Sequence, residues 1–400
     1  MSSTRQVHRG SFRKVRLNLV GFGNVGKALA RLLVDKGQEF RVHHGVEFIV
    51  TAIATGRHGS IVEPDGIDLA RVMKTLASGE MLQSRLSERG CSGTVSGIIR
   101  NAPGDIVVEL TPLNPETGEP AISHVRAALD TGKHVVSANK GPIAFAYSDL
   151  SLLAARRGLQ FLFESTVMDG APVFNLARYC LRGSSVLGFK GILNSTTNFV
   201  IGEMEKGHKF NDSVIRAMKL GFAEADPSMD LEGWDAAVKT AVLSNVLLGA
   251  DITPKDVERT GITQLTQFHI EKALKDGKRI KLACEAGFTK EHSDSCMPGH
   301  CDFGPEATLE GRICDFQQPI FPGPEPEAGS SGNSQKAFYA RVMPVCVEAA
   351  STFGQIEGTT SCLVLRTGLM GDLTLIEHAP GLVQTAYGVL NDLLEIAACL

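Results

Sequence analysis

Apolar and polar residues follow one another along the first third of the chain in blocks that predict strands alternating with helices. Helical periodicity over residues 27–36 and 121–132 separates short apolar runs that are rich in β-branched side chains. Strands that alternate with helices favour a parallel sheet with helical crossovers. The apolar runs expected to form the strands of this sheet are residues 15–21, 46–55, 105–111 and 133–140.

Beyond residue 150 the pattern changes. A helix and a short strand lead to a long helix after Asp230 that is apolar on nearly all sides, which is typical of a buried helix. Residues 287–336 are rich in Pro, Gly and Ser with little periodicity, and we expect a surface insertion that is partly disordered. Strand patterns then return, followed by a helix from Gln384 to about Ala398: the strand patterns are residues 338–345, 362–368 and 373–378.

Composition excludes several classes of protein. A chain of 400 residues with 43% hydrophobic and 21% charged residues fits a soluble globular protein of two or three domains. The net charge of −4 does not provide the basic field that nucleic acid requires, and no apolar run reaches the length of a membrane span. Residues 1–14 are expected to form a short arm, and nine scattered cysteines indicate reduced thiols in the cytoplasm.

A glycine turn follows the first predicted strand. In GFGNVG the residues Gly21, Gly23 and Gly26 match the pattern GxGxxG at the start of a helix. In a dinucleotide-binding turn the first glycine permits the turn and the second admits the pyrophosphate, while the third lets helix and strand pack closely. These glycines, with Asn24 and Val25 between them, are therefore predicted to bind a cofactor; the alternative is a turn used only for packing.

The second predicted strand lacks the carboxylate that usually binds the ribose hydroxyls of NAD. It ends in Ala-Thr-Gly-Arg-His, where Arg57 supplies a cation suited to a 2′-phosphate. We therefore expect NADP to be favoured over NAD, the alternative for Arg57 being a solvated loop residue. Thr111, at the end of the third strand, is a further candidate cofactor contact.

The densest group of ionisable residues lies in GFAEADPSMDLEGWDAAVK, residues 221–239. Pro227 places the acidic residues before it in a loop, and Asp230 is the expected N-cap of the long helix. Asp235 and Lys239 stand four residues apart, hence on one face. They form either an ordinary intrahelical ion pair or, because the helix is so apolar, part of a polar cleft.

Two further segments carry polar side chains at places that suit a ligand. Lys140 follows a buried strand, at the edge where open parallel sheets bind ligands, although a surface lysine is the alternative. In GILNSTTNF, residues 191–199, Asn194 and Thr196 either cap a turn or contact a ligand. The segment CMPGHC lies in the expected insertion and its spacing matches no common zinc framework.

The combination of motifs resembles the homoserine dehydrogenase family over most of the chain. The resemblance implies an NAD(P)-dependent interconversion of L-aspartate 4-semialdehyde and L-homoserine, a step towards threonine and methionine. Hydride passes between the alcohol carbon and the nicotinamide, and the hydroxyl proton needs a base. The motifs that carry the resemblance are GFGNVG, VSANKGPIA, ESTVMDGAPV, GILNSTTNF and, most specifically, GFAEADPSMDLEGWDAAVK.

The resemblance also implies roles for individual residues. Lys239 and Asp235 match the catalytic pair, with Lys239 as the acid and base, and Lys140 matches a further active-site lysine that also meets the cofactor. Glu224, together with Asp230, is expected to hold the ammonium group of the substrate. Asn194 and Thr196 are the other expected substrate contacts.

The same resemblance implies a sodium site. By match to the family its ligands would be Glu164, Val167, Asp169 and Ala171. The segment is less glycine-rich than in many members, with Met168 beside Asp169, and Ser195 stands where a glycine is more usual.

The family implies a fold class of α/β type: a Rossmann-type nucleotide-binding domain with an α+β substrate and dimerisation domain. We expect residues 15–162 and 376–400 in the first domain, residues 163–286 and 337–375 in the second, and a homodimer. Two other functions stay open. One is a related dehydrogenase acting on another small amino or hydroxy acid, and the other is a non-catalytic NADP-binding sensor.

Overall fold

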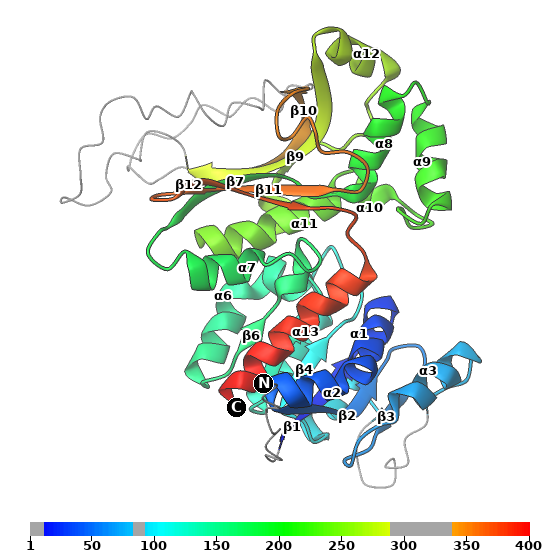
Figure 1. Ribbon diagram of the computed structural model, residues 1–400, viewed down its shortest axis with the longest axis vertical. Coiled ribbons are helices and arrows are strands. Elements are labelled where there is room, and N and C mark those ends of the chain that lie inside the picture. The colour runs from blue at the N-terminus through cyan, green and yellow to red at the C-terminus, as the bar shows by residue number, and fades with distance from the viewer. Residues whose placement is uncertain (1–11, 83–92, 289–337) are drawn as a thin grey trace, which may run out of the picture. The chain divides into compact units, whose positions relative to one another are not determined.

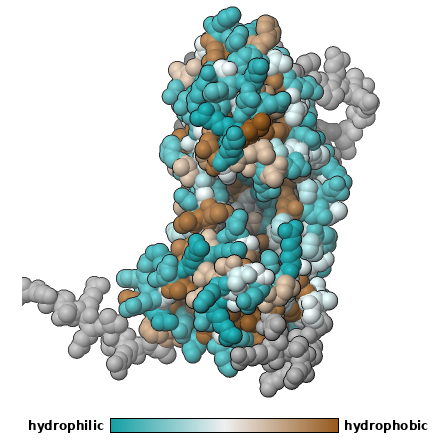
Figure 2. Space-filling view, turned by 90° about the vertical axis from the view of Figure 1, so that its right-hand side faces the viewer, coloured by the Kyte–Doolittle hydropathy of each residue, from teal (hydrophilic) through white to brown (hydrophobic). Residues whose placement is uncertain are grey.

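The computed structural model describes residues 12–82, 93–288 and 338–400. The chain divides into two compact units, here called unit 1 (Met1–Pro172 and Gly381–Leu400) and unit 2 (Val173–Pro380). Among the described residues no helix has the length and apolar character that a membrane span requires. On the face drawn in Figure 2, hydrophobic residues are scattered among hydrophilic ones.

Unit 1 is built on a six-stranded sheet in which every predicted strand of the first third is confirmed (Figure 1). All neighbouring pairs are parallel except β2 and β3, which are antiparallel. The strand order reverses between β1 and β4, and ligands of such sheets bind at the carboxyl ends of the strands at this point. In spatial order the strands are β3 (Ser60–Val62), β2 (Val46–Ala54), β1 (Arg13–Val20), β4 (Ile106–Glu109), β5 (His134–Ser137) and β6 (Phe161–Leu162).

Helices pack on this sheet and include the last helix of the chain. Figure 1 shows α13 beside α1, and buried apolar side chains of α13 belong to the same core as those of β1. Helix α1 begins three residues earlier than its periodicity predicts. The helical segments of unit 1 are α1 (Asn24–Asp35), α2 (Gly37–Glu39), a π-helical turn (Phe40–His44), α3 (Leu69–Ala77), α4 (Val95–Asn101), α5 (Ala121–Asp130), α6 (Gly141–Arg156), a 3₁₀ turn (Glu164–Thr166) and α13 (Leu382–Cys399).

The boundaries of the units differ from those expected. Residues 163–172 lie in unit 1, because Ser165 donates a hydrogen bond to the Thr385 carbonyl at 2.7 Å and Asp392 accepts one from the Glu164 amide at 2.9 Å. Residues 376–380 lie in unit 2, since β12 extends to Glu377. The expected insertion, 287–336, falls almost wholly outside the described residues, and so does the segment CMPGHC, whose spacing was compared with zinc frameworks.

Unit 2 contains a second six-stranded sheet, and the strand patterns expected near the C-terminus are confirmed in it. Its neighbouring strands are antiparallel except for β10 and β8, which are parallel. One face carries an apolar cluster that includes Ala283, Phe353 and Ile356. In spatial order the strands are β12 (Gly371–Glu377), β11 (Ser361–Thr367), β7 (Val186–Ile192), β9 (Lys278–Phe288), β10 (Phe338–Glu348) and β8 (Glu258–Arg259).

The long helix predicted after Asp230 is divided, so Asp230 is not its N-cap. A short helix ends at Leu231, and Gly233 then takes a φ of 82°, in the left-handed region that favours glycine. The buried helix begins at Trp234, with Gly233 as its N-cap. The helical segments of unit 2 are α7 (Val173–Asn175), a π-helical turn (Leu176–Cys180), α8 (Ser195–Glu205), α9 (Phe210–Lys219), α10 (Ser228–Leu231), α11 (Trp234–Leu243), a π-helical turn (Ser244–Leu248), a 3₁₀ turn (Pro254–Asp256) and α12 (Gln267–Lys275).

Candidate active site

The glycine turn of unit 1 lies at the point where the strand order reverses. Gly21 has a φ of 94°, and a Cβ there would lie 2.6 Å from the carbonyl carbon of Leu110, so both backbone conformation and space require glycine. A Cβ on Gly26 would meet the Gly21 carbonyl oxygen at 3.3 Å. These two glycines therefore let β1, β4 and α1 approach closely.

The start of α1 fits a pyrophosphate group. Apart from Gly23 and its two chain neighbours, no described residue has an atom within 4 Å of where a Cβ of Gly23 would be, so a ligand can approach the backbone there. The first turn of α1 has no acidic residue, and the amides of Asn24, Val25 and Gly26 occupy the helix N-terminus. Such amides and the helix dipole favour an anion.

Thr111 is held by a buried carboxylate at the end of β4. The side chain of Glu109 is fully buried and accepts hydrogen bonds from the Thr111 amide, at 2.8 Å, and from the Thr111 hydroxyl. The other oxygen of Glu109 lies 2.8 Å from Nδ1 of His124. Asn139 donates to the Thr111 carbonyl at 3.0 Å. The backbone and hydroxyl of Thr111 are thus fixed beside the glycine turn.

Lys140 stands in the next turn along the same edge of the sheet. It is the N-cap of α6, in the short turn that follows β5, and it is half-buried. Asn139 accepts a hydrogen bond from the Gly141 amide at 2.8 Å while its amide group holds Thr111. The predicted cofactor residues Thr111 and Lys140 are therefore connected through Asn139.

Arg57 lies at the tip of the hairpin that joins β2 and β3. Thr55 closes this turn, since its hydroxyl donates to the Gly59 carbonyl at 2.9 Å and accepts from the His58 amide at 2.8 Å. Arg57 is exposed at the tip. The turn presents a cation and no carboxylate, as its sequence predicts.

In unit 2, Asp235 and Lys239 form an ion pair on α11 that is connected to other polar groups. Lys239 Nζ lies 3.2 Å from Asp235 Oδ2 and donates to the Leu193 carbonyl at 2.6 Å. The side chain of Lys239 is only 16% exposed and that of Asp235 only 19%. The amine is therefore held from two sides, by a carboxylate and by a carbonyl at the end of β7.

Asn194 joins this pair to Asp230. Its Oδ1 accepts from the Thr197 amide at 2.9 Å and caps α8, while its Nδ2 donates to Asp230 at 2.7 Å and to Asp235 at 3.1 Å. Thr196 lies 2.9 Å from the second oxygen of Asp230. The capping interpretation of residues 191–199 is therefore confirmed, and the same asparagine also contacts the carboxylates of Asp230 and Asp235.

Burial and the nearby Asp235 carboxylate raise the pKa of Asp230 above its ordinary value, while hydrogen bonds from Asn194 and Thr196 lower it in part. We call Asn194, Thr196, Asp230, Asp235 and Lys239 the proton-transfer cluster, after the role that we propose for it below. It combines one amine, two carboxylates and two neutral donors.

Glu224 stands apart from this cluster. It is exposed on the loop before α10, and within the described part of the chain no hydrogen bond joins it to the cluster. The loop itself is attached, because the Phe222 carbonyl lies 2.7 Å from the Thr196 hydroxyl and the Phe222 ring lies 5.0 Å from that of Phe199. Glu224 is thus two residues from an anchored point.

The residues of the expected sodium site follow β6. Glu164 and Val167 are buried, and Asp169 has a φ of 41°, which is uncommon for a non-glycine residue. The Asp169 carboxylate accepts from the Thr385 hydroxyl at 2.5 Å, and the Ala171 amide donates to the Met168 carbonyl at 2.7 Å. Across residues 12–82, 93–288 and 338–400 no group of three or more His, Cys, Asp or Glu side chains is placed to hold a metal ion.

Several buried polar residues were not singled out by the sequence analysis. Glu109 and Lys281 each occupy a buried position of a strand, and His124 lies on a helix that is otherwise apolar on its buried face. A charged residue at a buried strand position needs a partner. This mismatch with the pattern is the signal that could have identified them.

Two family models match the chain. Residues 172–394 match the model described as homoserine dehydrogenase, and residues 21–164 match the one described as homoserine dehydrogenase, NAD binding domain. The chain is 34% identical to the NAD(+)-dependent homoserine dehydrogenase of Pseudomonas canavaninivorans, over 95% of this chain and 96% of that protein. It is 32% identical to the homoserine dehydrogenase of Methanocaldococcus jannaschii, over 94% and 97% of the two chains.

Solved structures agree with these matches. A crystal structure of a protein from Archaeoglobus fulgidus superimposes with a TM-score of 0.75 at 28% identity, covering 96% of this chain and 99% of that one. The similarity therefore extends over both units, and the expected fold class, a Rossmann-type domain with an α+β domain, is confirmed. The chain belongs to the homoserine dehydrogenase family.

Proposed function

We propose that this protein is an NAD(P)-dependent homoserine dehydrogenase, which interconverts L-aspartate 4-semialdehyde and L-homoserine. The observation that carries the proposal is the ion pair of Asp235 and Lys239, held by Asn194 and the Leu193 carbonyl in the unit that matches the family model. A structural ion pair alone would not require the neighbouring Asp230 and Thr196. This arrangement favours catalysis over a non-catalytic sensor, which needs no proton-transfer amine.

Lys239 is the proposed acid and base. In oxidation its neutral amine takes the proton of the substrate hydroxyl, and in reduction its ammonium polarises the aldehyde oxygen and returns the proton. Asp235 and the Leu193 carbonyl hold the amine in one orientation, so little freedom is lost when substrate binds. Asp235 is therefore assigned an orienting role beside the amine.

The nicotinamide cofactor, when bound, accepts or donates the hydride. Gly21, Gly23 and the amides at the start of α1 would hold its pyrophosphate. Thr111 and Lys140, which Asn139 connects, would meet the rest of the cofactor at the ends of β4 and β5. Lys140 is also assigned to the catalytic group by its match to the family.

The carboxylates of unit 2 suit an amino-acid substrate. Glu224 and Asp230 are the proposed partners of its ammonium group, and Asn194 and Thr196 of its polar atoms. Asp230 is presented by α10 and Glu224 by the loop that Thr196 attaches through the Phe222 carbonyl. Substrate binding would bring a cation to Asp230, which buried carboxylates favour.

For the cofactor preference we propose NADP over NAD, carried by Arg57 at the exposed tip of a turn without a carboxylate. The relative from Pseudomonas canavaninivorans is described as NAD(+)-dependent, so the preference needs its own test. In Arg57→Ala, KM for NADP should rise about tenfold with KM for NAD unchanged. Equal effects on both cofactors would show that Arg57 does not read the 2′-phosphate.

We also propose a sodium ion bound near Glu164, with Val167, Asp169 and Ala171 contributing backbone oxygens. The residues fit in part: Glu164 supplies a buried carboxylate, whereas the Asp169 carboxylate is already bonded to Thr385. Replacing sodium by choline at constant ionic strength should lower activity and the melting temperature. No change in either would remove the site.

A homodimer is the proposed assembly and the cytoplasm the proposed compartment. In unit 2, β12 is the edge strand of its sheet, and its side chains alternate between exposed and half-buried along its last residues. An unpaired edge of this kind is often covered by a partner. Light scattering of the purified protein should give twice the chain mass of 42.8 kDa, and a monomer at micromolar concentration would refute the dimer.

The function itself is tested by mixing the protein with L-homoserine and NADP or NAD at alkaline pH and following reduced nicotinamide by absorbance. Turnover with either cofactor is the expected result. A panel of other small amino and hydroxy alcohols separates the related dehydrogenase, since a much higher kcat/KM on one of them would replace homoserine as substrate. Cofactor binding without turnover on any alcohol would favour the sensor.

A further inference from the structure

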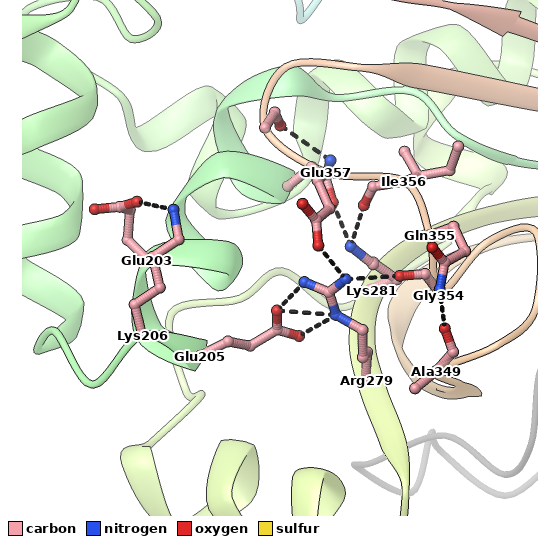
Figure 3. Close-up of polar contacts among 12 residues, drawn as sticks. Glu203, Glu205, Lys206, Arg279, Lys281, Ala349, Gly354, Gln355, Ile356 and Glu357 are labelled. Carbon is pink, nitrogen blue, oxygen red and sulfur yellow. Dashed lines mark hydrogen bonds and ion pairs between the residues drawn. The ribbon is translucent and has the colours of Figure 1, made fainter.

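Two cations at the start of β9 lie outside the proton-transfer cluster. Arg279 and Lys281 are two residues apart on the strand, so their side chains leave it on the same side (Figure 3). Lys281 is only 1% exposed, the most deeply buried lysine among the described residues. Neither residue has a part in the proposed reaction.

Lys281 connects α8 to the loop between β10 and β11. Its Nζ donates to Asn198 Oδ1 at 2.9 Å and to the carbonyl of Ile356. Figure 3 shows the side chain of Lys281 pointing towards Ile356. Asn198 in turn donates to the Gly358 carbonyl at 3.0 Å. One ammonium group and one amide thus join a helix, a strand and a loop.

Other contacts attach the same helix to the same loop. Arg279 binds the carboxylate of Glu205, at the end of α8, and donates to Glu357 at 2.7 Å (Figure 3). The hydroxyl of Ser195, at the start of α8, donates to the Thr359 carbonyl at 3.0 Å. The helix is therefore held at its start, at Asn198 and at its end. Ser195 is thus bonded to the loop between β10 and β11.

The first turn of α8 is part of the proton-transfer cluster. The backbone amide of Asn198 donates to the backbone carbonyl of Asn194 at 3.2 Å, so the two asparagines stand one helical turn apart. Asn194 binds Asp230 and Asp235, and Thr196 binds Asp230. A shift or rotation of α8 at Asn198 would consequently move the groups that orient Lys239.

We propose that Lys281 is a positioning residue for the reaction: through Asn198 it holds α8 at the setting in which Asn194 orients Asp235 and Lys239. This inference rests on the proposed function. It assigns Lys281 no contact with substrate or cofactor. Its effect is on how well the cluster is arranged, and a misplacement of about 1 Å far from the chemistry can cost on the order of a hundredfold in rate.

Stability alone does not require a lysine at this position. Burial, followed by the charge of the neighbouring Arg279, lowers the pKa of Lys281 to about 8. The charged form is therefore less favourable at this position than it is in water. Apolar residues often replace a buried charge together with its polar partners with no loss of stability, whereas removing the amine alone leaves the Asn198 and Ile356 oxygens without this donor. Hydrogen bonds from an amine are directional, whereas apolar contacts are not. The amine of Lys281 can therefore fix the angle and register at which α8 packs.

The test compares Lys281→Met with a matched control, Lys133→Met. Lys133 is also a buried lysine, 6% exposed, and burial lowers its pKa to about 8. It lies in unit 1, where its Nζ donates to the carbonyls of Ile99 and Ala102 at 2.6 Å. We expect Lys281→Met to lower kcat for homoserine about tenfold or more with KM for the cofactor unchanged, and Lys133→Met to leave both unchanged.

A second pair of measurements separates positioning from a loss of folding. Asn198→Leu should reproduce the loss in kcat, and the double variant Lys281→Met, Asn198→Leu should lose no more than the larger single effect. Melting temperatures are recorded for all variants. Equal losses in kcat for Lys281→Met and Lys133→Met, or additive losses in the double variant, would overturn the proposal.

Fluorescence gives a readout that does not depend on turnover. Trp234 is the only tryptophan of the chain, directly precedes Asp235, and has the Arg259 guanidinium 3.8 Å from its ring centre. We expect its emission to change in Lys281→Met and not in Lys133→Met. Failure of the wild-type protein to oxidise homoserine would refute the proposed function. Unchanged Trp234 emission in Lys281→Met would refute the positioning role of Lys281, whatever the activity assay shows.

Discussion

The hydroxyl of Thr196 has one hydrogen and two acceptors within reach. The Phe222 carbonyl lies at 2.7 Å and the Asp230 carboxylate at 2.9 Å, so only one of them receives the bond at any moment. An ionised Asp230 therefore lacks part of the hydrogen bonding that its burial demands, in agreement with a pKa raised first by burial and then by Asp235. At the scale of single residues, the cluster contains a carboxylate that is kept at a cost in stability.

Asp230→Asn should therefore raise the stability of the protein and lower its activity. An asparagine amide can donate to Thr196, which then donates to Phe222, and its oxygen can still accept from Asn194. We expect about 1 kcal/mol higher unfolding free energy at pH 7, with a lower kcat/KM for homoserine because the substrate ammonium loses a carboxylate. Denaturant unfolding and steady-state kinetics measure the two effects.

The sign of the pH dependence follows from the raised pKa. The folded pKa of Asp230 lies above the unfolded value, so its favourable contribution is complete below about pH 4 and is lost as pH rises through the folded pKa. The advantage of Asp230→Asn should accordingly be absent near pH 3.5 and present at pH 7. An advantage that is equal at both values would contradict the burial argument.

Lys239→Met removes the amine that the proposed mechanism requires. Turnover of homoserine should fall at least about a hundredfold, the usual contribution of a positioned acid or base, with cofactor binding retained because Lys239 belongs to unit 2. Steady-state rates and titration of reduced-cofactor fluorescence measure the two properties. Lys219→Met, on the exposed end of α9, is the control and should behave as wild type. Normal turnover in Lys239→Met would assign the proton transfer elsewhere.

At the scale of elements, the sheet of unit 2 contains an ionic row across three strands. Glu285 of β9 stands opposite Lys190 of β7 and Arg341 of β10 in the strand register, and contacts them at 3.2 and 2.8 Å. Burial would raise the pKa of Glu285, but the two cations outweigh it and hold the pKa below its usual value. The pairs thus favour one register for these strands.

Glu285→Gln should lower the unfolding free energy by about 2 kcal/mol at pH 7, since it leaves two partly buried cations without their carboxylate. Because the folded pKa of Glu285 is lowered, its contribution is complete above about pH 4.5 and is lost as pH falls through the folded pKa. Urea unfolding at pH 7 and pH 4 should therefore show a smaller difference at the lower pH. Glu47→Gln, which breaks a partly exposed pair with Arg41, is the control, and we expect it to have less effect than Glu285→Gln at pH 7.

Most elements could be predicted because apolar periodicity reports burial directly. Strands β1, β2, β4 and β5 of unit 1 and the last helix were predicted from such patterns alone, whereas β3 was not. The break at Gly233 could not be, because a glycine followed by good helix formers is also compatible with a continuous helix. Asp230 was consequently given a capping role, whereas it binds Asn194 and Thr196 from a helix of its own.

At the scale of the whole molecule, the chain leaves unit 1 after Pro172 and returns to it at Gly381. The candidate residues were predictable as members of motifs, but their partners were not, since Asn194 and Asp235 are 41 residues apart and Lys281 and Asn198 are 83 apart. No local pattern specifies such pairs. Residues 163–172 were expected in the second domain, not in unit 1, for the same reason: the helix that binds them comes more than 200 residues later in the chain.

The returning helix should consequently determine the stability of unit 1. Leu393 of α13 is fully buried in the core that also contains Leu17 and Leu29, whereas Leu382 at the start of the same helix is 51% exposed. Leu393→Ala should lower the unfolding free energy by about 3 kcal/mol and weaken NADP binding, because α13 packs against α1, whose first turn is the proposed pyrophosphate site. Leu382→Ala should change neither quantity appreciably. Denaturant unfolding with and without NADP measures both, and a Leu393→Ala protein as stable as Leu382→Ala would show that unit 1 holds together without the returning helix.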